Sequence, residues 1–300
     1  MHKDSRKNTG KAPIGTGRRV AIIGLGLMGG SLGLALRQRR NAPYVCGYAR
    51  RAATRGLALK MGAVDEVFSH PTDAARLADV VVICTPVLSI AGLAKACTPV
   101  LSQGTIITDV GSTKQYLLSK MAAMHVPFVG SHPIAGSEQN GLEAARSGLY
   151  RDTVVILTPS AESRRHSVKR LAAFWRSVGA RPVIMPAPEH DSMIAATSHL
   201  PHLLAALLVR HVSELKNVRI AGMCGGGFRD TTRIADGSPE MWHDVIATNA
   251  PAVRRELKRF GRLLDSCIKM IDGNNFTGIR RLLKKAQQQR RAILAARRHS

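Results

Sequence analysis

Three glycines near the start of the chain have the spacing of a phosphate-binding turn. They form a Gly-x-Gly-x-x-Gly pattern between an apolar run, residues 20–23, and a segment with helical apolar spacing. The first glycine permits a tight turn, the second lets the backbone approach a pyrophosphate, and the third allows helix and strand to pack closely. The helix N-terminus then attracts phosphate through its free N–H groups and its dipole. We expect a dinucleotide cofactor to be bound here by Gly24, Gly26, Leu27, Met28 and Gly29.

A histidine further along has the chemistry of a proton acceptor. His132 lies in the sequence Gly-Ser-His-Pro-Ile-Ala-Gly-Ser-Glu, residues 130–138, directly after an expected strand at 126–129. A loop at the end of a parallel strand lies at the edge of the sheet where ligands bind. Imidazole has an ordinary pKa of about 6.5, so it accepts a proton near neutral pH with little tuning. We interpret His132 as a catalytic base; a merely solvent-exposed histidine is the alternative.

Another group of polar side chains lies on one face of an expected helix. Asp191, Ser198, His199 and His202 have spacings that place them together. Pro201 removes one N–H from this helix and predicts a kink, so this face should border a cleft. The His-x-x-His pair could hold a metal, but the Glu-x-x-His companion and the third ligand of a bundle site are missing. We therefore expect no metal.

Three arginines indicate which anions are bound. A Rossmann domain that prefers NAD usually carries an acidic side chain about 20 residues beyond the glycines. Residues 47–51 read Gly-Tyr-Ala-Arg-Arg and contain no carboxylate. The guanidinium groups of Arg50 and Arg51 suit a ribose 2′-phosphate, so NADP is favoured and NAD stays possible; two exposed arginines at a helix start are the alternative. Arg233, beyond a glycine-rich turn, could grip a carboxylate with two parallel bonds or form a surface ion pair.

Alternating strands and helices must position these groups. Lys114 should begin a helix that residues 111–113 can cap. The succession predicts an α/β fold with a doubly wound Rossmann sheet, which gathers ligands at the carboxyl ends of its strands. Further strands are expected at 44–48, 79–84, 105–109, 126–129, 153–157 and 182–185. The residues at strand ends that we expect to contact the cofactor are Thr85, Pro86 and Asp109.

The strand signals stop near Pro186, and the remaining sequence is helical. Ser238 supplies a capping hydroxyl before a proline at the first helical position. Long helices are expected at 189–215, 239–272 and 276–296. The predicted parts are a disordered basic tail at 1–18, a dinucleotide-binding Rossmann domain at 19–187 and an all-helical domain at 188–300.

The bulk composition favours a cytoplasmic protein. The chain has 300 residues, 45% of them hydrophobic, which suffices for two domains. No apolar run reaches the roughly 18 residues that cross a bilayer, and the five cysteines form no Cys-x-x-Cys pair. Much of the net charge of +24 lies at the ends, with six Lys and Arg against one acid at 1–19 and fourteen against three at 254–300. We expect these ends to be solvated, with neither nucleic acid nor a membrane as partner.

Five blocks of the sequence together carry a family resemblance. They are the glycine turn, 109–114, 131–138, Asp191 with 198–202, and 227–235. In this order the chain resembles the prephenate/arogenate dehydrogenase family over about residues 19–272. The resemblance implies an NAD(P)-dependent oxidative decarboxylation of prephenate to 4-hydroxyphenylpyruvate in tyrosine biosynthesis. The alternative within the family is arogenate dehydrogenase, which gives tyrosine directly. An acidic partner for the amino group of arogenate would distinguish the two, and the sequence does not place one.

The resemblance also implies roles for individual residues. His132 would bond the ring hydroxyl of the substrate and take its proton, with Ser112 close to the same hydroxyl. Arg233 would hold the side-chain carboxylate. The helical domain would form a homodimer interface and contribute Trp242 to the neighbouring subunit. The remaining implied substrate residues are Ser198, His199 and His202, which would line the pocket, and Asp191 and Glu138, which would form a polar network around its entrance.

Two other functions agree with parts of the sequence. A β-hydroxyacid dehydrogenase has a very similar opening Gly-Leu-Gly-x-Met-Gly, but the glycine-rich helical segment with a catalytic lysine is not found here. A nucleotide-sensing protein could use the basic ends on nucleic acid, and salt-dependent DNA binding without oxidation of prephenate would favour it.

Overall fold

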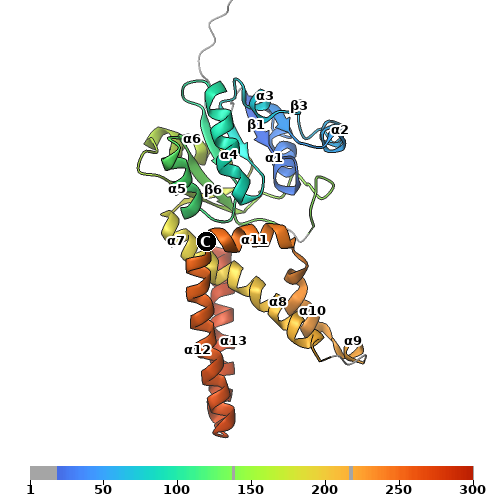
Figure 1. The fold of residues 1–300 in the computed structure, drawn as a ribbon, viewed down its shortest axis with the longest axis vertical. Helices are drawn as coiled ribbons and strands as arrows, with labels where there is room; N and C mark the ends of the chain where they lie inside the picture. The colour runs from blue at the N-terminus through green and yellow to red at the C-terminus, as the bar shows by residue number, and fades with distance from the viewer. Residues whose placement is uncertain (1–18, 137–138, 216–218, 300) are drawn as a thin grey trace, which may run out of the picture. The chain divides into compact units, whose positions relative to one another are not determined.

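The computed structural model describes residues 19–136, 139–215 and 219–299 (Figure 1). The expected basic tail, 1–18, lies outside the described residues. The chain divides into two compact units, one that extends to Ala250 and one that begins at Pro251. The boundary expected at 187/188 therefore falls inside the first unit and stays a prediction.

A five-stranded parallel sheet forms the first half of the chain. The strand order is β3-β2-β1-β4-β5, so the chain reverses direction across the sheet between β1 and β4. β4 is a continuous apolar run, and β1 is apolar after Arg19, because helices cover both faces of these strands (Figure 1). This confirms the doubly wound prediction. The strands are β1 (Arg19–Ile23), β2 (Tyr44–Tyr48), β3 (Glu66–Phe68), β4 (Val80–Ile83) and β5 (Ile106–Asp109), and the helices are α1 (Leu27–Arg37), α2 (Ala52–Lys60), α3 (Pro71–Ala75), α4 (Val87–Cys97) and α5 (Gln115–Ala123).

A second sheet of three strands holds the predicted base. β6 (Val129–Pro133) runs antiparallel to β7 (Val154–Pro159), and β8 (Arg181–Ile184) runs parallel to β7. The strand predicted at 126–129 thus begins at its last residue and continues through His132, which pairs with Ile156. The prediction that His132 lies on a loop is wrong. Glycine and proline around it resemble a turn, but its backbone is paired with β7 within a sheet.

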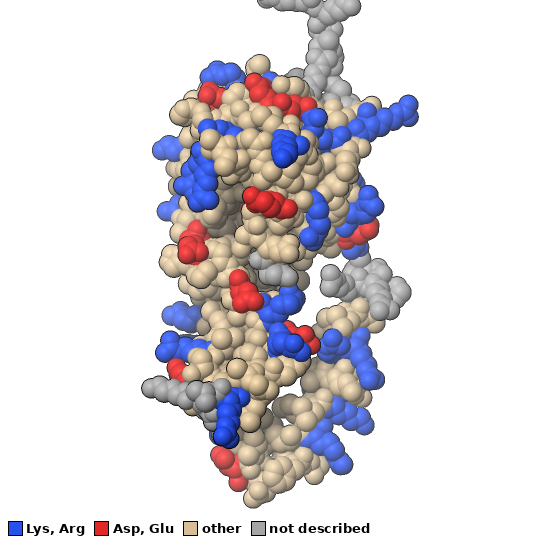
Figure 2. Space-filling model, turned by 90° about the vertical axis from the view of Figure 1, so that its right-hand side faces the viewer, with Lys and Arg blue, Asp and Glu red and all other residues tan. Residues whose placement is uncertain are grey.

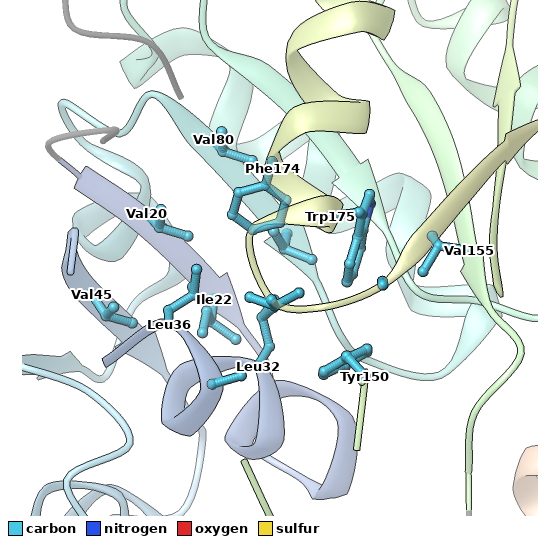
Figure 3. Close-up of a cluster of buried hydrophobic side chains, with 14 of the residues drawn as sticks. Val20, Ile22, Leu32, Leu36, Val45, Val80, Tyr150, Val155, Phe174 and Trp175 are labelled. Carbon is cyan, nitrogen blue, oxygen red and sulfur yellow. The ribbon is translucent and has the colours of Figure 1, made fainter. Parts of the chain in front are cut away.

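One helix joins the two sheets through a shared core. α6 (Arg165–Arg176) places Phe174 and Trp175 against Leu32 and Leu36 of α1, and all four side chains are buried (Figure 3). Burial of such side chains contributes about 1.5–3 kcal/mol each. The indole Nε1 of Trp175 also donates a hydrogen bond to Ser131 Oγ at 3.0 Å. The core therefore fixes the residue that precedes His132.

The rest of the first unit is helical, with two departures from the predicted helices. The helix expected at 189–215 begins at Ala187 and contains a π-helical turn at Ala195–His199, directly before the predicted kink at Pro201. The helix expected at 239–272 is broken at Asn249, where φ is −127° and ψ is 23°. Ser238 is the N-cap of α11, and its Oγ accepts the Met241 N–H at 3.3 Å. The elements are α7 (Ala187–Ile194), the π turn, α8 (Leu200–Ser213), α9 (Ile220–Met223), α10 (Gly226–Thr232), a 3-10 turn (Arg233–Asp236) and α11 (Pro239–Thr248).

One helical stretch among the described residues, 187–213, is long and apolar enough to cross a membrane. This differs from the expectation that no apolar run reaches that length, because a few polar residues interrupt the run in the sequence without ending the helix. His190, Asp191 and His199 are buried within this stretch. Their side chains make hydrogen bonds to other elements of the same unit, as in the core helix of a globular domain.

The second unit consists of two long helices. α12 (Ala250–Asp272) and α13 (Phe276–His299) are joined by a short turn at Asn274, whose φ is 52°. α13 contains no acidic residue. Lys and Arg also outnumber Asp and Glu on the face of the protein in Figure 2, in line with the strongly basic composition.

Candidate active site

The glycine turn is tightly packed at Gly24 and Gly29 and open at Gly26. A Cβ on Gly24, where φ is +107°, would lie 2.7 Å from the carbonyl oxygen of Cys84, and one on Gly29 would lie 2.0 Å from the carbonyl oxygen of Gly24. A Cβ on Gly26 would meet no atom within 4 Å. The N-cap of α1 is Gly26, which has no side chain to cap the helix, and the first turn of α1 holds no acidic residue. Open space beside uncapped N–H groups fits the pyrophosphate of a dinucleotide.

The end of β2 lies beside this turn. The Gly24 N–H donates to the carbonyl oxygen of Tyr48 at 3.0 Å. Beyond Tyr48 the loop is held by Arg55, whose guanidinium donates to the carbonyl oxygens of Ala49 and Arg50 at 2.9 and 2.7 Å. The side chains of Arg50 and Arg51 are exposed. Positive charge therefore stands where a Rossmann domain meets the adenosine ribose.

The residues predicted at the ends of β4 and β5 differ in what they offer a cofactor. Thr85 is half-buried and Pro86 exposed, and the Thr85 hydroxyl accepts a hydrogen bond from Ser89 at 2.8 Å. Asp109, in contrast, is fully buried and accepts the N–H groups of Gly111 and Ser131 at 2.8 and 3.0 Å.

A buried lysine completes the surroundings of Asp109. Lys114, also fully buried, forms an ion pair with the Asp109 carboxylate. Burial raises the pKa of Asp109 and lowers that of Lys114. The Asp109 carboxylate is thus engaged inside the protein, and the expected contact of Asp109 with the cofactor stays a prediction.

His132 stands at the end of a chain of buried polar groups. Its Nδ1 lies 2.8 Å from Nε2 of His190, and Nδ1 of His190 lies 2.7 Å from Oδ1 of Asp191. Burial and the neighbouring groups of His190 and Lys114 hold the pKa of His132 well below its ordinary value. The imidazole is therefore neutral near pH 7 and can accept a proton. His190 is not among the residues that the sequence analysis selected.

Asp191 has a different position from the one expected. Its carboxylate accepts the backbone N–H groups of Lys114 at 2.8 Å and Gln115 at 2.9 Å, and so caps α5. The prediction that residues 111–113 cap this helix is wrong, because a side chain 77 positions away takes that place. Asp191 is 3% exposed, and its expected membership of the polar network around the pocket entrance stays a prediction.

His199 connects this chain to a neighbouring pocket. The amide Nδ2 of Asn249 donates to the Asp191 carbonyl oxygen at 2.9 Å and lies 3.3 Å from Nδ1 of His199. Because Nδ1 of His199 accepts this bond, its buried Nε2 carries a proton, and Nε2 has no partner among the described residues. Burial lowers the pKa of His199 to about 4. A neutral imidazole with an unused N–H is suited to a ligand oxygen.

A cavity of about 350 Å³ brings together four predicted substrate residues, Ser198, His202, Arg233 and Trp242. The rings of His202 and Trp242 are stacked with centroids 3.6 Å apart, and His199 meets the same indole edge-on at 6.0 Å. Trp242 thus packs within its own chain, and its expected contribution to a neighbouring subunit stays a prediction. A larger cavity of about 700 Å³ lies between the start of β5, α5 and α6 and contains none of the predicted site residues.

Three predicted residues are less directly tied to this arrangement. Neither His132 nor His199 lines the 350 Å³ cavity. Hydrogen bonds run from His132 through His190, Asp191 and Asn249 to His199, whose ring contacts the cavity residue Trp242. Ser112 is half-buried in the loop after β5, next to Thr113, whose hydroxyl lies 2.8 Å from that of Thr248. Glu138 lies outside the described residues.

A dinucleotide turn and a neutral imidazole in one compact unit, beside an arginine-lined pocket, are the parts of a nicotinamide-dependent oxidoreductase, in which the cofactor carries the hydride and the protein orients the substrate. The comparison with known families is more specific. The nucleotide-binding domain of prephenate dehydrogenase matches residues 32–184, and the dimerization domain of prephenate dehydrogenase matches residues 186–285. The chain belongs to the prephenate/arogenate dehydrogenase family.

Individual relatives agree with this assignment. The chain is 35% identical to a cyclohexadienyl dehydrogenase of Zymomonas mobilis, over 81% of this chain and 85% of the relative. It is 31% identical to a prephenate dehydrogenase of Bacillus subtilis, over 90% and 75%. A crystal structure of prephenate dehydrogenase from A. aeolicus with hydroxyphenyl propionate and NAD+ superposes with a TM-score of 0.87 at 30% identity, and covers 92% of this chain and 98% of that one.

Proposed function

We propose that the protein oxidises and decarboxylates prephenate to 4-hydroxyphenylpyruvate in tyrosine biosynthesis, with arogenate as the alternative substrate. The observation that carries the proposal is the state of His132. Its lowered pKa keeps the ring neutral near pH 7, and its Nδ1 is held 2.8 Å from His190. A fixed, neutral imidazole is suited to take a proton from a substrate hydroxyl.

The reaction needs a base that first takes and later returns one proton. As hydride leaves the carbon that bears the ring hydroxyl, His132 accepts the hydroxyl proton. The ring carboxylate leaves as CO2, its bonding electrons complete the aromatic ring, and His132 returns the proton to the oxygen. The nicotinamide, when bound, takes the hydride. Aromatisation supplies the driving force, so the protein chiefly positions the reactants, with Ser112 near the same oxygen.

The pocket supports prephenate over arogenate. Arg233 lines it and can hold the side-chain carboxylate in a bidentate contact, beside Ser198 and His202. Among the described residues that line the pocket there is no Asp or Glu to pair with the amino group of arogenate. Glu138 is proposed to contribute to the polar network at the entrance, as in the family resemblance.

The cofactor we propose is NADP, with NAD as the alternative. The exposed Arg50 and Arg51 follow β2 with no carboxylate between residues 47 and 51, which suits a 2′-phosphate better than a ribose hydroxyl. The backbone of the glycine turn and the ends of β4 at Thr85 and Pro86 would contact the remainder of the dinucleotide.

We further propose a cytoplasmic homodimer with a domain boundary at 187/188. The match to a dimerization domain over residues 186–285 supports both the boundary and the helical interface. Its relatives named prephenate dehydrogenase are consistent with a soluble enzyme.

Absorbance of the reduced nicotinamide tests the proposal with prephenate and arogenate, each with NADP and NAD. We expect prephenate with NADP to give the highest kcat/KM. His132→Asn should then lower kcat by about a hundredfold or more and leave cofactor affinity nearly unchanged. His166→Asn, at an exposed histidine of α6, is the matched control and should keep full activity. Unchanged turnover in His132→Asn would remove His132 from the mechanism.

A further inference from the structure

We propose that His190 and Asp191 form a positioning chain that fixes which ring nitrogen His132 presents to the substrate. This inference rests on the proposed function, because it assigns the proton-accepting atom of that reaction. It concerns two residues that do not meet the substrate themselves: both are buried, and His190 is separated from the reacting centre by the ring of His132.

The direction of the chain is set at Asp191. Its carboxylate faces two backbone N–H groups, those of Lys114 and Gln115, and backbone nitrogen can only donate. Oδ1, which accepts from Lys114, is also 2.7 Å from Nδ1 of His190. The carboxylate is therefore an acceptor toward all three groups, and His190 carries its proton on Nδ1.

The remaining protons follow from this one. With its ring proton on Nδ1, His190 has a lone pair on Nε2, the atom that lies 2.8 Å from Nδ1 of His132. His132 must then donate from Nδ1, and its lone pair lies on Nε2. A neutral imidazole accepts a proton only at the nitrogen that lacks one. The chain thus makes Nε2 of His132 the base for the ring hydroxyl.

The same contacts hold the ring in place. His132 and His190 meet edge-on, with ring centroids 5.0 Å apart and planes at 69°, so His132 cannot rotate about its long axis without losing the hydrogen bond. Asp191 is anchored to the first residues of α5, and His190 immediately precedes Asp191 on α7. The His132 ring is therefore oriented by α5 and α7 through Asp191 and His190, and its backbone is held in β6.

Two variants of His190 separate positioning from packing. The amide of His190→Gln reaches the position of Nε2 and can still accept from His132, whereas the shorter amide of His190→Asn reaches only the position of Nδ1 and keeps the contact with Asp191. We expect kcat in His190→Asn to fall at least about tenfold with the KM for prephenate within about twofold, and His190→Gln to stay within about threefold of the wild type. Equal losses in the two variants, or a loss confined to KM, would overturn the proposal.

The tautomer of His132 provides a second readout that needs no substrate and no variant of His190. In 15N-histidine-labelled protein at pH 7, with the His132 signal assigned from its loss in His132→Asn, we expect Nδ1 protonated and Nε2 unprotonated. A proton on Nε2 would overturn the chain even if both His190 variants failed to fold. If the wild type does not oxidise prephenate, the proposed function fails while the tautomer remains measurable, so the two failures are distinguishable.

Discussion

Replacing Lys114 by methionine tests how much the buried ion pair beneath β6 stabilises the first unit. The substitution keeps a long apolar chain but leaves the Asp109 carboxylate, among the residues that the structure describes, with only the N–H groups of Gly111 and Ser131. Breaking one partner of a buried pair usually destabilises a protein by about 3–5 kcal/mol. The carboxyl can instead take up a proton, which at pH 7 costs about 4 kcal/mol relative to an ordinary pKa near 3.9. We therefore expect a loss of about 3–4 kcal/mol.

The pH dependence makes this prediction specific. With Lys114 gone, the folded-state pKa of Asp109 lies above its unfolded value, so the folded state binds the proton more readily. The loss in free energy of unfolding should then shrink as the pH falls from 7 to 5. It should shrink by about 1.4 kcal/mol per pH unit wherever protonation of the Asp109 carboxyl determines the loss. Urea unfolding at fixed protein concentration, followed by fluorescence, measures it, since both tryptophans, Trp175 and Trp242, lie in the first unit.

A matched surface substitution provides the control. Arg210 pairs with Glu214 at 2.9 Å across one helical turn, but the two side chains are 77% and 60% exposed. Arg210→Met should change stability by no more than about 0.5 kcal/mol. A loss below about 1 kcal/mol in Lys114→Met, or a loss of the same size at pH 7 and pH 5, would refute the reasoning.

Three further outcomes are expected. Gly29→Ala should lower the melting temperature and weaken cofactor binding at least about tenfold, because its Cβ would lie 2.0 Å from the Gly24 carbonyl oxygen. Gly26→Ala has open space around the new Cβ and should weaken cofactor binding without lowering the melting temperature. Equal melting temperatures in the two variants would contradict this. The pKa of His199 is about 4 in the folded protein and about 6.5 when unfolded, so the free energy of unfolding should fall by up to about 3 kcal/mol between pH 6.5 and pH 4. Urea titrations at the two pH values measure this fall, and it should be smaller in a His199→Gln variant. Arg233→Ala should raise the KM for prephenate by about tenfold or more and change kcat little, and steady-state kinetics showing the reverse would exclude a uniform binding role.

The sequence was sufficient to predict every strand of the parallel sheet except β3, and strands close to β7 and β8, but not the full extent of β6 or the separate sheet that these three strands form. β4 is a continuous apolar run and β1 is apolar after Arg19, because strands covered by helices on both faces need no polar side. β6 reads Val-Gly-Ser-His-Pro, which has neither alternation nor an apolar run. β6 is a strand because it pairs with β7. Two hydrogen bonds at Ser131 also hold it: the Trp175 indole donates to the Ser131 hydroxyl, and the Ser131 N–H donates to the Asp109 carboxylate. Local propensity contains none of these long-range contacts.

The residues of the candidate site were also predictable from the sequence only in part. The glycine turn follows from spacing within six residues, and the pocket residues Ser198 and His202 follow from helical periodicity. His190 could have been selected from its place next to Asp191, but its partner His132 is 58 positions away. The break at Asn249 has one local signal, a proline two residues later, which fits the first turn of a new helix. The bond of this asparagine to Asp191 could not be read from the sequence.

Placing His132 in a strand has an entropic consequence for turnover. A catalytic group on an unstructured loop must surrender backbone freedom worth about 1–2 kcal/mol per residue each time the productive arrangement forms. The backbone of His132 surrenders that freedom once, during folding, when it pairs with Ile156. Ligand recognition can therefore be altered by substitutions in the surrounding helices and turns while the imidazole stays where the sheet holds it.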